Sequence, residues 1–332
     1  MASISDNLSL CGRTLKNRIV FLPCVTFSFR GDGEDYFGGQ HLEHYRQMAE
    51  GGAGIVYVQG TDAQGWLSET GQWTPGSKRT LEKVTAAIHE NGALAMIQLS
   101  WGGDTVTDLN AMTADALAAK QQELLSAALG IGELGFDGFE FHFGHTFLLC
   151  KTLDAEANQR TDRFGGSLEN RMHVLTDILP EIRSKNGAGF ILSVRMGAYL
   201  PDLENGRATA RALEAAGIDV LNITMSMVPP KPAPEGFPLS DMVYGGWLMK
   251  QAVTIPVIGV GGLTDRAKLD TLIEDGYADL AGVAHSILAD PAFPRKVLAR
   301  EPFYACAGCP ECFWYTDHTK CPARVKAVRE VV

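Results

Sequence analysis

The sequence contains no run of eighteen apolar residues, which is the length that a membrane-spanning helix needs. Residues 1–18 also lack the apolar core of a secretion signal, and this predicts a cytoplasmic location. Basic clusters are missing, and the formal net charge is −10, so nucleic acid is not expected as a partner. The composition therefore predicts a globular protein that binds neither membranes nor nucleic acids.

The seven cysteines are an odd number and occur without a secretion signal, so a disulfide framework is not expected. Four of them are clustered near the C-terminus with the spacing C-x2-C-x2-C-x8-C, at Cys306, Cys309, Cys312 and Cys321. Four thiolates suit either a structural zinc ion or a [4Fe–4S] cluster, and the spacing alone does not separate the two. The other three are expected to be free thiols: Cys11, Cys24 and Cys150.

Short runs rich in Val and Ile recur along the chain and predict buried parallel strands. They lie at residues 19–22, 55–59, 94–99, 138–142, 191–195, 220–224, 257–260 and 280–283. Helical patterns separate them, at residues 41–50, 81–91, 114–134, 168–185, 206–216, 245–251 and 266–275. Eight strands that alternate with helices predict an α/β fold, namely a (β/α)8 TIM barrel.

A doubly wound sheet is the structural alternative, but no G-x-G-x-x-G follows an early strand, which disfavours it. We predict a barrel over residues 1–295 and a small four-cysteine lobe over residues 296–332 that packs on the barrel. In such a barrel, the active site lies at the carboxyl ends of the strands.

Polar residues gather where these strands end. Residues 97–103 read IQLSWGG, residues 136–145 read FDGFEFHFGH, and residues 158–171 read NQRTDRFGGSLENR. Together with the C-x2-C-x2-C run, these segments resemble the Old Yellow Enzyme family of flavin oxidoreductases. The resemblance is closest to its iron–sulfur branch, which contains 2,4-dienoyl-CoA reductase and trimethylamine dehydrogenase, and it runs from about residue 15 to residue 321. Because that branch joins a flavin barrel to a cluster, it favours [4Fe–4S] over zinc here.

The resemblance implies a bound FMN. Gln98 would pair with the pyrimidine edge of the ring, because an amide both donates and accepts hydrogen bonds. Arg195 would place a cation beside the N1–C2=O region, where negative charge gathers on reduction. Each residue alone also has a structural interpretation, but their joint placement at strand ends favours a cofactor site. The other implied FMN contacts are Pro23, Cys24, Val25, Gly261, Gly262, Ala284 and His285.

A histidine pair, His142 and His145, ends the fourth predicted strand. The resemblance implies that both face the substrate above the flavin and hydrogen-bond an oxygen or an anionic group. A metal site built from this pair is the weaker alternative, because no third ligand lies nearby in the sequence. The stretch 158–171 is expected to form a structural polar network rather than to take part in catalysis.

Several positions depart from the family pattern. Phe147 stands where ene-reducing members usually have a tyrosine that donates a proton to the substrate carbon. Val25 cannot donate a hydrogen bond to the flavin, and Ala284-His285 replaces a Gly-Arg pair that grips the phosphate. The loop after Trp101-Gly102-Gly103 and the last cysteine gap are both short. These departures leave the proton donor and the phosphate contact open.

The sequence thus predicts an FMN and [4Fe–4S] oxidoreductase that transfers a hydride between flavin N5 and an organic substrate. Reduction of an activated C=C bond is placed first and amine dehydrogenation second. The chain ends at Val332 without a second nucleotide-binding domain, so we expect either a separate electron carrier or subunit or a direct reaction of NAD(P)H at the barrel flavin. The oligomeric state stays open. Two other classes remain: a non-catalytic electron-transfer or scaffold subunit, and a barrel lyase or isomerase with a zinc lobe.

Overall fold

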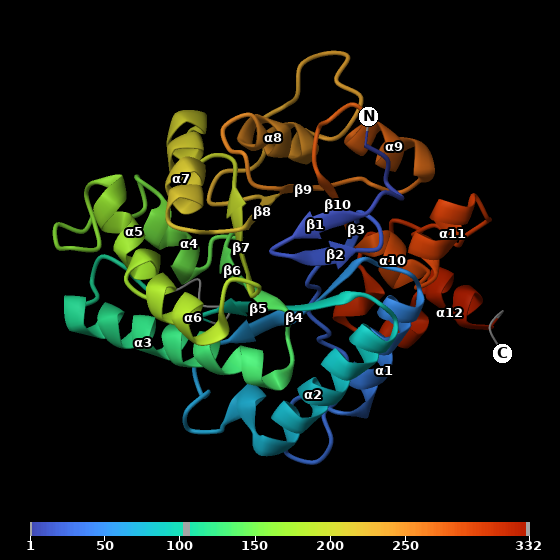
Figure 1. The fold of residues 1–332 in the computed structure, drawn as a ribbon, viewed down its shortest axis with the longest axis horizontal. Helices are drawn as coiled ribbons and strands as arrows, with labels where there is room; N and C mark the ends of the chain where they lie inside the picture. The colour runs from blue at the N-terminus through green and yellow to red at the C-terminus, as the bar shows by residue number, and fades with distance from the viewer. Residues whose placement is uncertain (1, 102–106, 330–332) are drawn as a thin grey trace.

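The computed structural model describes residues 2–101 and 107–329. Eight parallel strands close into a barrel that helices surround, which confirms the predicted (β/α)8 fold (Figure 1). The strands follow one another around the barrel in chain order, and the last pairs with the first. They are β3 (Ile19–Phe21), β4 (Ile55–Asp62), β5 (Leu94–Ser100), β6 (Gly138–Phe143), β7 (Ile191–Gly197), β8 (Val220–Thr224), β9 (Val257–Val260) and β10 (Leu280–Val283).

The strand register places polar residues side by side inside the barrel. Gln98 on β5 is level with Glu140 on β6, and His142 on β6 is level with Arg195 on β7. Arg195 in turn is level with Asn222 on β8. Alternate residues of a strand share one face, so Glu140 and His142 point the same way. The fold thereby collects these polar groups near one end of an otherwise apolar barrel.

The helices of the barrel cover its outer surface, and most begin at a side-chain cap. Thr113, Ser167, Ser240 and Asp265 each accept a hydrogen bond from a backbone N–H of the first turn of their helix. The barrel helices are α1 (Gly39–Glu50), α2 (Pro75–Glu90), α3 (Ala114–Ile131), α4 (Leu148–Leu153), α5 (Leu168–Thr176), α6 (Leu179–Asn186), α7 (Leu203–Ala215), α8 (Asp241–Lys250) and α9 (Arg266–Glu274).

Several elements differ from the sequence prediction, which did not include α4 or the helices after β10. The single helix expected over residues 168–185 is divided into α5 and α6, because Pro180 cannot continue the hydrogen-bond ladder of a preceding helix and starts a new one. An antiparallel hairpin of β1 (Leu8–Leu10) and β2 (Arg13–Leu15) was not predicted. Leu10 and Leu15 of this hairpin pack against the apolar residues that fill the barrel near the strand starts. The hairpin therefore closes the end of the barrel opposite the candidate site.

The segment after β10 forms α10 (His285–Ala289), α11 (Phe293–Ala299), a loop that carries three of the clustered cysteines, and α12 (Pro322–Arg329). We call residues 300–329 the C-terminal lobe. It lies beside α1 (Figure 1), where Arg324 donates to Gln47. It also contacts the loop after β3, where Ser28 Oγ is 2.8 Å from His318 Nδ1. The domain boundary predicted after residue 295 falls inside α11 and stays a prediction.

The stretch 158–171 forms the expected polar network. Asn158 Nδ2 donates to the carbonyls of Thr152 and Phe164, both at 2.8 Å. Arg171 Nε donates to the carbonyl of Leu153 at 3.0 Å, while Ser167 caps α5. These bonds fix the loop after β6.

No helix in the described parts of the chain has the length and apolar character that crossing a membrane requires.

Candidate active site

A cavity of about 1100 Å³ opens at the carboxyl ends of the barrel strands. Barrel enzymes place their active sites at this end. All the residues expected to contact substrate or flavin lie on its wall: Pro23, Cys24, Val25, Gln98, His142, His145, Arg195, Gly261, Gly262, Ala284 and His285. The structure thus brings these positions together, whereas Gly102 and Gly103 lie outside the described residues.

Arg195 is the buried cation of the cavity, with 8% of its surface exposed. Its Nη2 donates to Thr224 Oγ1 at 3.3 Å, while its Nε has no hydrogen-bond partner. Burial lowers the pKa of Arg195, and the nearby Glu140 carboxylate opposes that shift. A buried cation with a free donor is suited to bind an electron-rich group of a ligand.

Glu140 anchors the floor of the cavity. This fully buried carboxylate accepts hydrogen bonds from Gln98 Nε2 at 2.8 Å, Asn222 Nδ2 at 2.9 Å and Ser193 Oγ at 3.2 Å. Burial raises the pKa of Glu140, while Arg195 and these three donors hold it down. Gln98 donates one of its amide hydrogens to Glu140, so the orientation of the Gln98 amide is fixed before any ligand binds.

His142 and His145 stand together on the cavity wall, with ring centroids 4.8 Å apart. The chain turns sharply here: His145 and Thr146 have φ values of 59° and 66°, in the left-handed region. His145 Nε2 lies 2.9 Å from Thr224 Oγ1, and His142 Nδ1 has no partner. Thr224 therefore contacts both the histidine pair and Arg195.

Both imidazoles are neutral near pH 7. Burial, and then the positive charge of Arg195, lowers the pKa of His145 to about 4 and that of His142 well below its usual range. A neutral imidazole carries one N–H, so each ring can donate one hydrogen bond. The pair is thus suited to bind a carbonyl oxygen without adding charge.

The depressed pKa of His145 predicts an acid-dependent loss of stability. The unfolded state binds a proton on this side chain near pH 6.5, whereas the folded state does so only near pH 4. The stability that the low pKa of His145 adds to the folded state is complete above about pH 6.5, and it is lost as the pH falls from there toward 4. We expect the urea midpoint to fall less steeply over this window in His145→Gln than in the natural protein; equal slopes would contradict it.

Gly261 and Gly262 form the loop after β9, with φ values of 116° and 70°. A Cβ on Gly261 would lie 2.8 Å from Ser240 Oγ and 2.9 Å from Met242 Cβ, so no other residue fits there. The loop is held by a hydrogen bond from Ser240 Oγ to the carbonyl of Gly261 at 2.9 Å. It leaves an open, backbone-lined corner of the cavity, next to Ala284 and the exposed His285.

The loop after β3 forms another wall. Burial raises the pKa of Cys24 to about 12, so this thiol stays protonated. Two residues later, the N–H and Oγ1 of Thr26 donate to Gln59 Oε1 at 3.0 and 2.5 Å. Gln59 also donates to Tyr36 Oη at 2.8 Å. This chain of bonds holds the loop that carries Pro23, Cys24 and Val25 against the barrel.

The C-terminal lobe supplies a wall that the sequence did not predict: Cys312, Trp314 and Tyr315 line the same cavity. The Tyr315 ring packs against Phe27, with centroids 5.7 Å apart. The other three clustered cysteines are also free thiols, but they do not converge with Cys312. In the described part of the chain, no three His, Cys, Asp or Glu side chains lie close enough together to hold a metal ion.

Sequence reasoning missed several residues of this site, among them Glu140, Thr224, Trp314 and Tyr315. Glu140 could have been found, because a charged residue two positions before His142 in a buried strand must point into the barrel with it. Thr224 could also have been found, because it is the last residue of β8 and the carboxyl ends of barrel strands face the active site. Nothing local in the sequence predicts that Tyr315 returns to this cavity.

Comparison with known proteins agrees with this geometry. Residues 8–122 and 104–302 match the NADH:flavin oxidoreductase / NADH oxidase family. An NADPH dehydrogenase of Halalkalibacterium halodurans is 29% identical over 316 residues, which cover 86% of this chain and 90% of that protein. The lyase or isomerase alternative therefore does not apply.

Two solved structures share the fold. A 2-naphthoyl-CoA reductase is 23% identical with a TM-score of 0.79, covering 94% of this chain and 55% of that one. A histamine dehydrogenase of Rhizobium sp. 4-9 is 19% identical with a TM-score of 0.76, covering 91% of this chain and 49% of that one. The chain spans about half the length of these two proteins. The family match over most of its length shows that the chain is a flavin-dependent oxidoreductase of the NADH:flavin oxidoreductase / NADH oxidase family.

Proposed function

We propose that this protein binds FMN at the mouth of the barrel and reduces an activated C=C bond of a small organic substrate. The observation that carries the proposal is the pairing of a buried Arg195, whose Nε lacks a partner, with two neutral histidines in one cavity. A cation suits the electron-rich edge of a flavin, and uncharged N–H donors suit a carbonyl oxygen.

The residues present fit FMN. Arg195 and Gln98 would hold the polar edge of the ring, with Glu140 fixing both. Pro23, Cys24 and Val25 would line the ring through their backbone. Gly261 and Gly262, together with Ala284 and His285, would hold the phosphate in the open corner after β9 and β10. When bound, FMN supplies hydride exchange at N5 with the organic substrate.

The chain's own residues would then orient the substrate. His142 and His145 would each donate a hydrogen bond to its carbonyl oxygen, which withdraws electrons from the adjoining C=C bond. Phe147 packs against His142, with ring centroids 5.3 Å apart, and cannot supply a proton. The proton must therefore come from another part of the wall, and we assign it to Tyr315.

Amine dehydrogenation is the second candidate function. Phe147, which lines the cavity and has no proton to donate, favours it, and the fold of this chain is shared with a histamine dehydrogenase. Anaerobic incubation with an unsaturated carbonyl compound and, separately, with methylated amines separates the two, with flavin absorption as the readout. Re-oxidation of the reduced enzyme by the unsaturated compound supports the reductase. Bleaching by an amine, without turnover of the unsaturated compound, would reverse the order.

We further propose that Cys306, Cys309, Cys312 and Cys321 hold a [4Fe–4S] cluster in the C-terminal lobe. Four free thiols within one short segment beside the flavin cavity support this by their chemistry, but they would have to draw together to bind iron. The cluster, when bound, would supply one-electron transfer to or from a separate carrier protein or subunit. No step of the substrate reaction above depends on it.

Replacing Cys309 with alanine tests the ligand set. We expect the variant to lose its iron and acid-labile sulfide while it keeps its FMN, because Cys309 lies outside the wall of the flavin cavity. Elemental analysis and flavin release on denaturation measure both. Cys150→Ala is the matched control, since that cysteine is buried behind β6 and is expected to leave iron content unchanged. Iron that survives in Cys309→Ala, or zinc in the natural protein, would contradict the assignment.

A further inference from the structure

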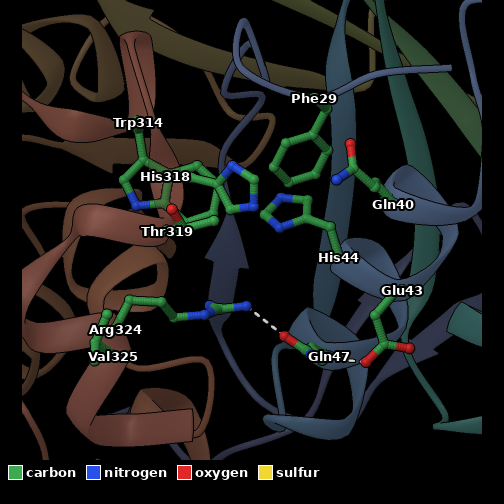
Figure 2. A pocket seen from close by; sticks show the side chains of 10 residues that line it. All are labelled: Phe29, Gln40, Glu43, His44, Gln47, Trp314, His318, Thr319, Arg324 and Val325. Carbon is green, nitrogen blue, oxygen red and sulfur yellow. Dashed lines mark hydrogen bonds between the residues drawn. The ribbon is translucent and has the colours of Figure 1, made fainter.

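A second cavity of about 410 Å³ lies between α1 and the C-terminal lobe. Figure 2 shows that its wall has two halves: Phe29, Glu43 and His44 come from the N-terminal part of the chain, and Trp314 and Arg324 from the C-terminal lobe. Its lining is mostly aromatic and aliphatic. Apart from Trp314, which also lines the flavin cavity, these residues belong neither to the candidate active site nor to the cysteine cluster.

Two buried polar groups on this wall have no partner. His44 is 3% exposed, and neither of its ring nitrogens makes a hydrogen bond. Trp314 is 4% exposed, and its Nε1 donor is also unsatisfied. The two rings are in contact, with centroids 5.3 Å apart. Since a buried polar group without a partner costs free energy, two of them at one cavity indicate a missing ligand.

The cavity also contains a cation that makes no direct ion pair, because the nearby Asp290 pairs with Lys296 instead. Arg324 donates to Gln47 Oε1 and, at 3.4 Å, to the carbonyl of Leu288, and both acceptors are uncharged. Its guanidinium lies 5.7 Å from the Trp314 ring centroid. No ion pair among the described residues includes it. Because this half-buried guanidinium bonds only uncharged acceptors, it has capacity for an acidic group.

Glu43 is the one acidic residue on the wall, and its charge is already compensated. Its carboxylate pairs with Arg46 at 2.6 Å and accepts from Gln47 Nε2 at 2.5 Å. His44 is neutral, because burial and then the charge of Arg324 lower its pKa well below the usual range. The net charge presented to a ligand is therefore that of Arg324.

From this arrangement we propose that the second cavity binds a small organic carboxylate. Its carboxylate group would pair with Arg324 and accept from Trp314 Nε1 and from the N–H of His44. Its apolar, planar body would lie against the rings of Phe29 and His318, whose centroids are 4.5 Å apart. A guanidinium matches a carboxylate in two parallel hydrogen bonds, and a cavity of this volume admits only a small ligand.

Trp314 lies on the wall of both cavities. A carboxylate in the second cavity would thus fix a residue that also borders the flavin, between Cys312 and Tyr315. The site is consequently placed to modulate the flavin cavity without touching substrate.

Benzoate is a suitable probe for isothermal titration of the flavin-loaded protein, with inorganic phosphate and benzamide as comparison ligands. We expect benzoate to bind with one site per chain, and phosphate and benzamide to bind at least tenfold more weakly. Arg324→Met should weaken benzoate roughly 10- to 100-fold, because a hydrogen-bonded charge pair is lost. Arg295→Met is the matched control, since that arginine is exposed on α11 and should leave binding unchanged.

Two further variants locate the bound molecule. His145→Ala alters only the flavin cavity and should leave benzoate binding intact, whereas Val325→Phe should fill the second cavity and abolish it. Val325→Phe also serves if Arg324→Met does not fold. Binding that survives both Arg324→Met and Val325→Phe, or that disappears in His145→Ala alone, would place benzoate at the flavin and overturn the proposal. Tighter binding of phosphate than of benzoate, or no binding of either, would also overturn it.

Discussion

Arg195→Met is expected to slow reduction of the bound flavin by NADPH roughly 100- to 1000-fold, the usual consequence of removing a preorganised charge-stabilising donor. Arg195 is the buried cation on the cavity wall, and methionine keeps its length without its charge. The midpoint potential of the flavin should fall as well, because negative charge near N1–C2=O loses its counter-ion. Stopped-flow absorption and dye equilibration measure the rate and the potential.

The same change leaves the buried Glu140 without a cation, so a folding defect has to be separated from a chemical one. The double variant Arg195→Met with Glu140→Gln removes both charges and keeps one acceptor oxygen, for either Gln98 or Asn222, which bond different oxygens of Glu140. We expect it to fold better than Arg195→Met and still to show the low potential. If the double variant has the flavin midpoint potential and the flavin reduction rate of the natural protein, Arg195 does not stabilise the reduced flavin.

Tyr315→Phe is expected to slow re-oxidation of the reduced enzyme by an unsaturated carbonyl compound by about 100-fold or more, as loss of a general acid does. Tyr315 lines the flavin cavity, and partial burial raises its pKa, so it holds its proton near neutral pH. Flavin reduction by NADPH should be unaffected, because that half-reaction needs no proton at the substrate carbon. Rapid mixing of pre-reduced enzyme with substrate, in H2O and in D2O, measures the step.

Tyr36→Phe is the matched control, because Tyr36 is the other phenol on the cavity wall among the described residues. Its oxygen already accepts from Gln59 Nε2, within the chain of bonds that holds the β3 loop. A slow re-oxidation in Tyr36→Phe with a natural rate in Tyr315→Phe would transfer the proton-donor role to Tyr36. Natural rates in both variants would favour amine oxidation, in which no such donor is required.

The barrel was predictable because its strands are buried on both faces and therefore appear as apolar runs. The predicted starts of all eight strands coincide with the observed ones. The N-terminal hairpin was not predictable in this way: its strands have three residues each, and Ser9 and Thr14 face away from the core. Pro180 was a visible signal for the break between α5 and α6, but the helical periodicity on either side of it masked the break.

The site was predictable where it lies on strand ends and was missed where it depends on distant contacts. Gln98, His142 and Arg195 were expected from the family resemblance together with their positions at the ends of β5, β6 and β7. The walls that Trp314 and Tyr315 provide depend on the docking of the C-terminal lobe, and no local pattern encodes that docking. The roles of the individual residues, the cluster and the electron partner stay predictions.

The contact between Ser28 and His318 joins positions that are 290 residues apart, and β10 pairs with β3 to close the barrel. Contacts of such long sequence separation form late, because the loop entropy must be lost before they contribute. A ribosome-bound chain that has not yet exposed β10 therefore has no complete flavin pocket. Cofactor loading would have to follow the synthesis of β10, and a chain that lacks β10 would present the polar ends of its barrel strands uncovered.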